Sequence, residues 1–426
     1  MRTRSSSLSS CAILATLLGS AALACSAPAD SADSQETVGQ SQEELTKKEA
    51  VSALRGGLFF TLGVPNTQDN GRACATCHVP QDAFGLTPAH VEERWQALQA
   101  RREHNKNADD PLFRSIDADD FANDYTKLRT HALVRVVITL PVNAAGQKLV
   151  WPVDDPTATT AAVWRGTPSV NNVAFTGPYQ LDGRKLTLQE QALGALQAHS
   201  ETQRDATASR LDDLAAFQSQ LFSSPSVREL SIALANGQPP PPTDPVLTPL
   251  EQQGKALVTG FCTQTCHVGP TQTKVAPPFA DRQNILISRP LPPFVPPALA
   301  AKFLPSPLSP PPGTPGPPAR LWAFKNPSPA GGPPIVIPST DPGKALLTGN
   351  PNDIGQFDNP AFYGLSKTAP YFHDNSAKTI EEVMQHYVAF FEFLQLPQVI
   401  PPNNGPRPPV IQPFMVAPMV AYLKKI

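Results

Sequence analysis

The stretch Cys74-Ala75-Thr76-Cys77-His78 decides how the rest of this chain is interpreted, because it has the form C-x-x-C-H. This pattern is the attachment signature of c-type haem, in which two cysteines form thioether bonds and the adjacent histidine ligates the iron. A second stretch, Cys262-Thr263-Gln264-Thr265-Cys266-His267, repeats the pattern about 190 residues later with one extra residue. These two haem strings predict two covalent haems on two similar halves of the chain.

The cysteine spacing has a mechanical reason. Residues three or four positions apart lie on one face of a helix, so both sulfurs of each string can meet one edge of the porphyrin while the histidine reaches the iron. Zinc is the alternative, because Cys and His side chains also build four-ligand zinc centres. The residues predicted to attach and ligate the haems are Cys74, Cys77, His78, Cys262, Cys266 and His267.

Residues 1–24 predict a secretory signal peptide. Basic residues precede an apolar run that ends at Ala24, and this run is too short for a membrane span. Ala22-Leu23-Ala24 fits a cleavage site, and Cys25 behind it fits a lipid anchor, with cleavage to a soluble form as the alternative. We therefore predict an exported bacterial protein, periplasmic or anchored in the outer membrane, since c-type haem is attached outside the cytoplasm.

The composition bounds the fold and the partners. A chain of 426 residues has room for two or three domains. A net charge of -2 gives no argument for nucleic acid, and we expect none as a partner. The predicted segments after the signal peptide are a flexible tether (25–46), an N-terminal haem domain (47–238), a proline-rich linker (239–249) and a C-terminal haem domain (250–426).

Apolar periodicity predicts several helices. One begins near Lys47, and one strand-like run covers 133–140. The other predicted helices cover residues 88–103, 187–199, 210–221, 251–257, 379–394 and 417–425.

The segment 290–342 contains nineteen of the 50 prolines. Proline removes a backbone donor, so we expect neither an interior helix nor a central strand there. The prediction is a long surface insertion of the second domain with polyproline II character.

Several motifs carry a family resemblance. Their order along the chain resembles that of bacterial dihaem cytochrome c peroxidases and their MauG-like relatives, over roughly 50–285 and 350–426. The matching stretches are Trp164 to Asn172 (R-x-T-P-S-x-x-N), Asp182-Gly183-Arg184, Thr187 to Ala192 (L-E-E-Q-A), Thr368 to Asp374 (T-A-P-Y-F-H-D) and Thr379 to Tyr387 (L-E-E-V-x-x-H-Y).

The resemblance implies a mainly α fold of two cytochrome c-like haem domains. It also implies a reaction, in which one haem takes electrons from a small cytochrome or cupredoxin and the other reduces hydrogen peroxide to water. A glutamate of the L-E-E-Q stretch is the acid–base group of that family. Here Gln189 stands at its position and the carboxylate follows at Glu190, so both are candidate catalytic residues.

The axial position opposite each histidine separates electron carriers from peroxide-reactive haems. His90 and Met415 are our candidate distal ligands.

Two further positions depart from the family pattern. Gly166 stands where the family commonly has asparagine at a calcium site, which leaves calcium open, and Asn375 replaces the glycine after P-Y-F-H-D.

The leading hypothesis is a dihaem cytochrome c peroxidase. The alternatives are a MauG-like dihaem oxidase acting on a protein or organic substrate, and a non-catalytic dihaem electron carrier. The family also makes a homodimer one of the expected assemblies.

Overall fold

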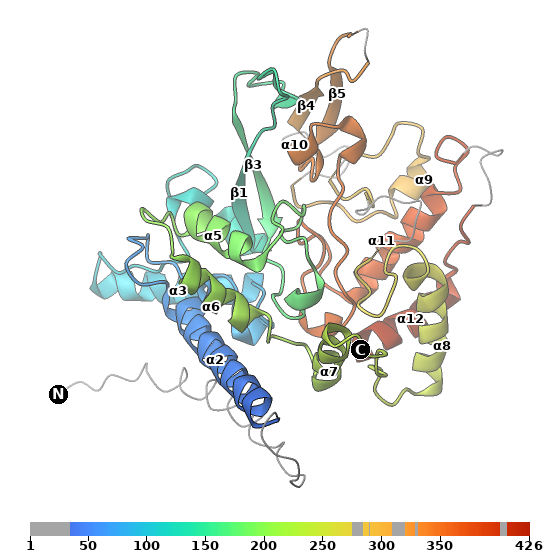
Figure 1. The fold of residues 1–426 in the computed structure, drawn as a ribbon. Helices are drawn as coiled ribbons and strands as arrows, with labels where there is room; N and C mark the ends of the chain where they lie inside the picture. Colours follow the sequence, from blue (N-terminus) through green and yellow to red (C-terminus); the bar gives the residue numbers. More distant parts are fainter. Residues whose placement is uncertain (1–34, 275–283, 289, 309–319, 329–330, 401–406) are drawn as a thin grey trace. The chain divides into compact units, whose positions relative to one another are not determined.

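The structure is a computed structural model, which describes residues 35–274, 284–288, 290–308, 320–328, 331–400 and 407–426, with side chains from Lys47 onward. Helices predominate in this part of the chain, as predicted (Figure 1). The helices are α2 (Gln35–Leu62), α3 (Pro88–His104), α4 (Thr126–His131), α5 (Leu188–His199), α6 (Ala208–Gln218), α7 (Pro225–Ala235), α8 (Pro249–Val258), α9 (Pro297–Ala300), α10 (Ala345–Thr348), α11 (Ile380–Phe393) and α12 (Pro413–Lys425).

The predicted helices match α2, α3, α5, α6, α8, α11 and α12 to within a few residues. The main difference lies at the N-terminus, where α2 already begins at Gln35, inside the expected tether 25–46. The glutamine and glutamate residues that suggested a tether are also good helix formers, so composition alone did not separate the two states. The signal peptide and Cys25 lie outside the described residues.

Each haem string lies beside a pair of helices that cross at a glycine. A Cβ on Gly56 of α2 would lie 1.8 Å from the backbone oxygen of Asp213 in α6. A Cβ on Gly254 of α8 would lie 2.0 Å from the backbone oxygen of Pro418 in α12. Only glycine allows so close an approach of the two backbones.

The segments 168–190 and 360–382 repeat one local structure at a constant offset of 192 residues. Each contains an isolated β-bridge and then a threonine whose hydroxyl accepts a hydrogen bond from the backbone N–H three residues later. The matched pairs are the bridges Tyr179–Lys185 and Tyr371–Ala377 and the helix-capping residues Thr187 and Thr379.

The two repeats meet through reciprocal backbone contacts. Gly166 donates its N–H to the carbonyl of His373 (2.7 Å), and Asp358 donates its N–H to the carbonyl of Leu181 (2.9 Å). These two bonds are related by the same offset of 192 residues, as in a twofold interface where residue i contacts j and j contacts i. The halves therefore pack about an approximate twofold axis.

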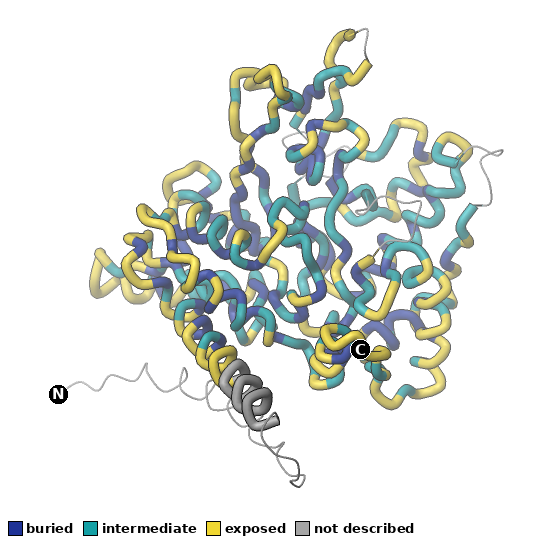
Figure 2. The backbone as a smooth tube through the Cα atoms, in the orientation of Figure 1, coloured by how far each residue is buried: buried dark blue, intermediate teal, exposed yellow. Residues whose placement is uncertain are grey.

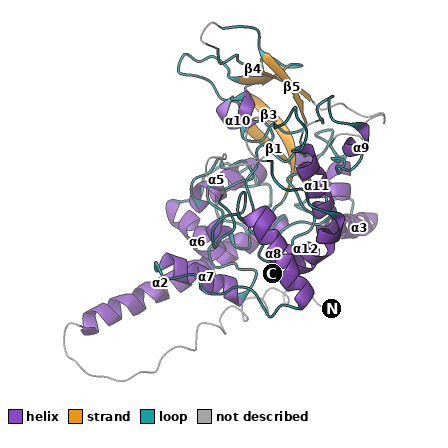
Figure 3. Cartoon of the chain, turned by 90° about the vertical axis from the view of Figure 1, so that its right-hand side faces the viewer, coloured by secondary structure: helices purple, strands orange, loops and turns teal. Residues whose placement is uncertain are grey.

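The strands form two small antiparallel sheets. Strand β1 (Leu133–Thr139) pairs with β3 (Thr160–Gly166), and the predicted strand 133–140 is thereby confirmed. The second sheet has the order β2-β4-β5, formed by Val150–Pro152, Arg320–Phe324 and Ile335–Ser339. Figure 3 shows the labelled strands of both sheets gathered on one side of the helices.

The expectation of a plain surface loop over 290–342 is wrong for three stretches, the short helix α9 and the strands β4 and β5. Strand β4 is the central strand of its sheet, and Trp322 and Phe324 are buried in the core. Figure 2 shows buried stretches, in dark blue, in the region where Figure 1 labels β4 and β5. The reason is local, since β4 itself contains no proline, whereas Pro338 lies in the edge strand β5, where proline is tolerated. Residues 289, 309–319 and 329–330 are outside the described part of the chain.

The described chain divides into two units, Met1–Ala50 and Val51–Ile426. Both haem strings lie in the second unit, where the sheet β2-β4-β5 joins strands from before and after the linker. The domain boundary at 239–249 stays a prediction. None of the helices in the described chain is both long and apolar enough to cross a membrane.

Candidate haem-attachment sites

The first haem string begins in a short 3-10 helix, Cys74–Thr76, rather than in the α-helix that the spacing suggested. The backbone N–H groups of Cys77 and His78 both donate to the carbonyl of Cys74, at 3.2 and 2.9 Å. The hydroxyl of Thr76 accepts from the N–H of Ala73 (3.0 Å) and closes the turn. The two cysteines and the histidine are therefore held in one compact turn.

The ring of His78 is oriented by the loop behind it. Its Nδ1 lies 3.0 Å from the carbonyl oxygen of Phe84, and this oxygen can only accept, so Nδ1 carries the proton. The other ring nitrogen, Nε2, then holds the lone pair that would bind iron. Burial lowers the pKa of His78, against the opposing effect of the carbonyls of Phe84 and Pro168, so the ring is neutral as a metal ligand requires.

The second haem string begins at the end of a π-helical turn, Thr259–Thr263. The N–H groups of Cys266 and His267 both donate to the carbonyl of Cys262, at 3.2 and 3.0 Å. The arrangement is that of the first string, except that each of these two hydrogen bonds spans one more residue of the chain. The insertion therefore widens the turn and leaves the second cysteine and the histidine attached to the same carbonyl.

His267 repeats the orientation of His78. Its Nδ1 lies 3.0 Å from the carbonyl oxygen of Gln272. Burial lowers the pKa of His267 to about 4, although the carbonyls of Gln272 and Pro360 oppose the shift. The two acceptor carbonyls are equivalent, since Phe84 and Gln272 both have φ 60°, and Pro168 and Pro360 are related by the 192-residue offset.

The four cysteines are free thiols, and Cys74, Cys77 and Cys262 pack against apolar core clusters. Burial raises the pKa of Cys74 and of Cys262 to about 12, and it raises that of Cys77 and Cys266 as well. Cys74 packs beside Phe60 and Leu196, and Cys262 packs beside Tyr371 and Met384. Such walls suit a flat apolar group, so the residues present fit c-type haem.

Among the described residues, no three His, Cys, Asp or Glu side chains gather as a metal-binding group. The cysteines of the two strings therefore do not share one four-ligand zinc centre.

The loop ahead of the first string is held by Arg72, whose side chain is almost completely buried. Its guanidinium donates to the carbonyls of Pro111 (2.8 Å) and Leu112 (2.7 Å) and forms an ion pair with Asp117 (2.7 Å). Because Arg72 lies two residues before Cys74, these contacts fix where the haem string begins. Sequence reasoning missed this residue.

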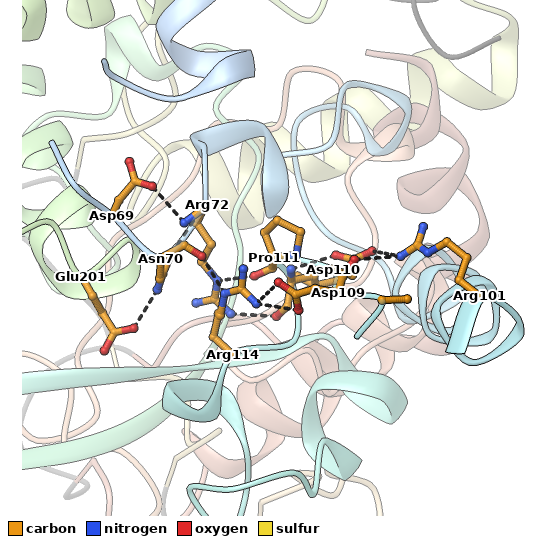
Figure 4. Close-up of polar contacts among 12 residues, drawn as sticks. Asp69, Asn70, Arg72, Arg101, Asp109, Asp110, Pro111, Arg114 and Glu201 are labelled. Carbon is orange, nitrogen blue, oxygen red and sulfur yellow. Dashed lines mark hydrogen bonds and ion pairs between the residues drawn. The ribbon is translucent and has the colours of Figure 1, made fainter. Parts of the chain in front are cut away.

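Figure 4 shows the polar contacts around this loop. Arg114 donates to the carbonyl of Asn70 (2.7 Å) and pairs with the carboxylate of Asp109 (2.8 Å). The side chain of Asn70 in turn donates to Glu201 (2.8 Å), just beyond α5. The loop is thus tied to two separate segments of the first half.

The two candidate catalytic residues lie in the first turn of α5. Glu190 is exposed, and its carboxylate accepts from the N–H of Leu186 (2.8 Å). The Nε2 of Gln189 donates to Asp212 of α6 (3.1 Å). These contacts favour a helix-capping role for Glu190, and its acid–base role stays a prediction.

The second half repeats this arrangement. The carboxylate of Glu382 accepts from the N–H of Lys378, as that of Glu190 does from Leu186. Glu381, the equivalent of Gln189, pairs with Lys424 of α12 (2.5 Å). The same contacts in both halves indicate a structural role that each half shares.

The distal-ligand candidates are separated by the structure. His90 lies half-buried in the first turn of α3, where its backbone N–H donates to the Thr87 hydroxyl. Met415, on α12, packs in the cluster that contains Cys262. Tyr387 also lies beside the second string, where burial and then the charges of its cysteines raise the pKa of its hydroxyl. Both axial assignments stay predictions.

A buried ionic network crosses between the halves. Arg165 of β3 pairs with Asp341 (2.6 Å) and Asp182 (2.6 Å), and Asp182 also pairs with Arg184 (2.7 Å). Burial disfavours the charge on Arg165, but the two carboxylates outweigh it and raise its pKa. His373 stacks on Phe357 nearby, with ring centroids 3.9 Å apart.

Comparison with known proteins finds a family model that matches the part of the chain around the first haem string. Residues 58–235 match the model of the di-haem cytochrome c peroxidase family. No curated protein matches this chain.

Solved structures show weak likeness. A MauG-like protein associated with microbial copper homeostasis is 16% identical, with TM-score 0.40 and coverage of 87% of this chain and 87% of that one. The diheme peroxidase BthA from Burkholderia thailandensis is 15% identical, with TM-score 0.37 and coverage of 88% and 85%. Hydrazine synthase from Kuenenia stuttgartiensis is 14% identical, with TM-score 0.33 and coverage of 80% and 93%.

Proposed function

We propose that this chain, whose residues 58–235 match the model of the di-haem cytochrome c peroxidase family, reduces hydrogen peroxide to water with electrons from a small donor protein. The observation that carries the proposal is the pair of haem strings, which present two histidines in the same orientation within equivalent halves. Peroxide reduction takes two electrons, and two one-electron sites in one chain suit that requirement.

Each residue of the strings has a defined task in this proposal. The cysteines hold the two haems covalently, and His78 and His267 ligate the irons through Nε2 because Nδ1 is bonded to a carbonyl. When bound, haem iron supplies the redox chemistry that cleaves the O–O bond. Family precedent puts peroxide at the first string and electron entry at the second.

The acid–base residue is the open point of the proposal. General acid–base help is typically worth about a hundred- to ten-thousand-fold in rate. Glu190 is the nearest carboxylate in sequence to the family position, and it engages the N-terminus of α5. This placement is the observation that favours the alternative of a dihaem electron carrier, in which no acid–base group is needed.

The proposal extends to location and partners. We propose export to the periplasm or outer membrane, with a lipid anchor at Cys25, and a small cytochrome or cupredoxin as the electron donor. A homodimer and a MauG-like oxidation of a protein or organic substrate are the alternatives that the family brings.

Absorption and EPR spectra of the holoprotein test the function. We expect two covalent haems, one of which changes its spectrum on addition of peroxide, and turnover of peroxide with a reduced small cytochrome. In the variants His78→Ala and His267→Ala, we expect the peroxide response to disappear only in the first. Two irons that are both six-coordinate and indifferent to peroxide would identify an electron carrier instead.

A further inference from the structure

We infer that the side chain of Asn375 packs against the backbone of Gly166 and joins the two halves there, at the place where the family pattern would put a calcium ion. The inference is independent of the proposed peroxidase activity and holds whether or not peroxide is turned over. It rests on the geometry of one buried contact between β3 and the loop directly before α11, which contains Asn375.

The side chain of Asn375 fills the space that a side chain at position 166 would need. A Cβ built on Gly166 would lie 2.2 Å from Oδ1 of Asn375 and 2.6 Å from its Cγ. Real side chains do not approach so closely, and Asn375 is itself only 7% exposed. Glycine at 166 and asparagine at 375 are therefore matched to each other.

The amide of Asn375 also binds the backbone of the first half. Its Nδ2 donates to the carbonyl of His131 (2.8 Å) and, more weakly, to that of Ala132 (3.4 Å). These carbonyls lie directly before β1, whose first residue pairs with Gly166. Together with the bond from Gly166 N–H to the His373 carbonyl, they form a hydrogen-bonded clasp between the halves.

A calcium ion does not fit this clasp. Calcium takes six to eight oxygen ligands at about 2.3–2.6 Å. Here Gly166 offers no side-chain oxygen, and the carbonyls of His131 and Ala132 already face the N–H groups of Asn375, whose positive ends would repel a cation. Within the described residues no acidic cluster stands at this place either.

The exchange explains two departures from the family pattern at once. The family has asparagine at the position of Gly166 and glycine at that of Asn375, so this chain carries the asparagine on the opposite side of the same contact. The backbone permits it, because Asn375 has φ 57° and asparagine tolerates the left-handed region. Its equivalent in the first half is Gly183, with φ 72°.

Thermal unfolding of the holoprotein and three variants tests the clasp. We expect Gly166→Asn to lower Tm strongly, because the new side chain collides with Asn375, and Asn375→Gly to lower it less. The double variant Gly166→Asn, Asn375→Gly should unfold at a higher Tm than Gly166→Asn alone, since the swap removes the collision. Additive losses in the double variant would contradict the clasp.

Calcium and an isosteric variant complete the test, and they decide it even if Gly166→Asn does not fold. We expect the Tm and the haem spectrum of the natural protein to be the same in excess calcium chloride and in EGTA. A rise of Tm with calcium would overturn the inference. Asn375→Asp keeps the size but cannot donate to the two carbonyls, so we expect a lower Tm in EGTA. A Tm equal to that of the natural protein would also overturn it.

Discussion

At the scale of single residues, backbone carbonyls define the two haem sites. The carbonyls of Phe84 and Gln272 select the tautomer of the two histidines, and both residues hold φ 60° to do so. Neither Phe nor Gln is typical of the left-handed region. Their sequence therefore gave no sign of this role, and the strained backbone marks a functional loop.

The placement of Glu190 leads to a prediction about stability and rate. Its carboxylate accepts from Leu186 N–H at the positive end of α5, and glutamine keeps the acceptor but loses the charge, so we expect Glu190→Gln to lower the free energy of unfolding by about 0.3–1 kcal/mol. Glu382→Gln, in the second half, should cost a similar amount. Denaturant unfolding and peroxide turnover measure both effects. A loss of a hundred-fold or more in rate for Glu190→Gln alone would instead establish its acid–base role.

His386 gives a prediction about acid stability. The side chain is completely buried, its Nε2 lies 2.7 Å from the carbonyl of Ile285, and burial lowers its pKa to about 4. The unfolded chain binds a proton at a pKa of about 6.5, so stability is full above that value and falls as pH decreases towards 4. The stability lost over this window is up to about 3 kcal/mol. We expect His386→Gln to flatten that part of a plot of unfolding free energy against pH, and an unchanged slope would refute the assignment.

At the scale of elements, the two helix crossings are the most constrained features. The Cβ of Gly254→Ala would lie 2.0 Å from the Pro418 backbone oxygen, so α8 and α12 would have to move apart. We expect a loss of about 1–3 kcal/mol, as for other overpacked contacts. Gly260→Ala is the matched control, because nothing lies within 4 Å of its added Cβ. Equal unfolding free energies for the two variants would show that the crossing is not tight.

At the scale of the whole molecule, the buried ionic network holds the halves together. Arg165→Met would leave Asp341 and Asp182 buried with one cation fewer, and we expect a loss of about 3–5 kcal/mol. Arg320→Met breaks the exposed pair with Asp154 and should cost at most about 1 kcal/mol. Chemical denaturation of both variants checks the difference. Similar losses would mean that Arg165 is not the main link between the halves.

The sequence by itself determined the local features. The two haem strings are recognised by their spacing, and most helices and the strand at 133–140 follow from periodicity. Both are properties of neighbouring residues. The family resemblance also followed from short motifs, and the match over residues 58–235 agrees with it. The prediction of a surface loop over 290–342 failed at β4 because a proline count averages over the whole segment, whereas β4 is a short run without proline.

Only the tertiary structure decided how the halves fit together. Three features join residues that are far apart in sequence. They are the contacts of Arg72 with the loop at Leu112, the ionic network around Arg165, and the contact of Gly166 with Asn375. Their energies depend on burial and on direct contact, and neither quantity is a function of local sequence. For the same reason, Gly166 and Asn375 look like two separate departures from the family pattern in the sequence alone. In the fold they are in contact, so they are two parts of one exchange.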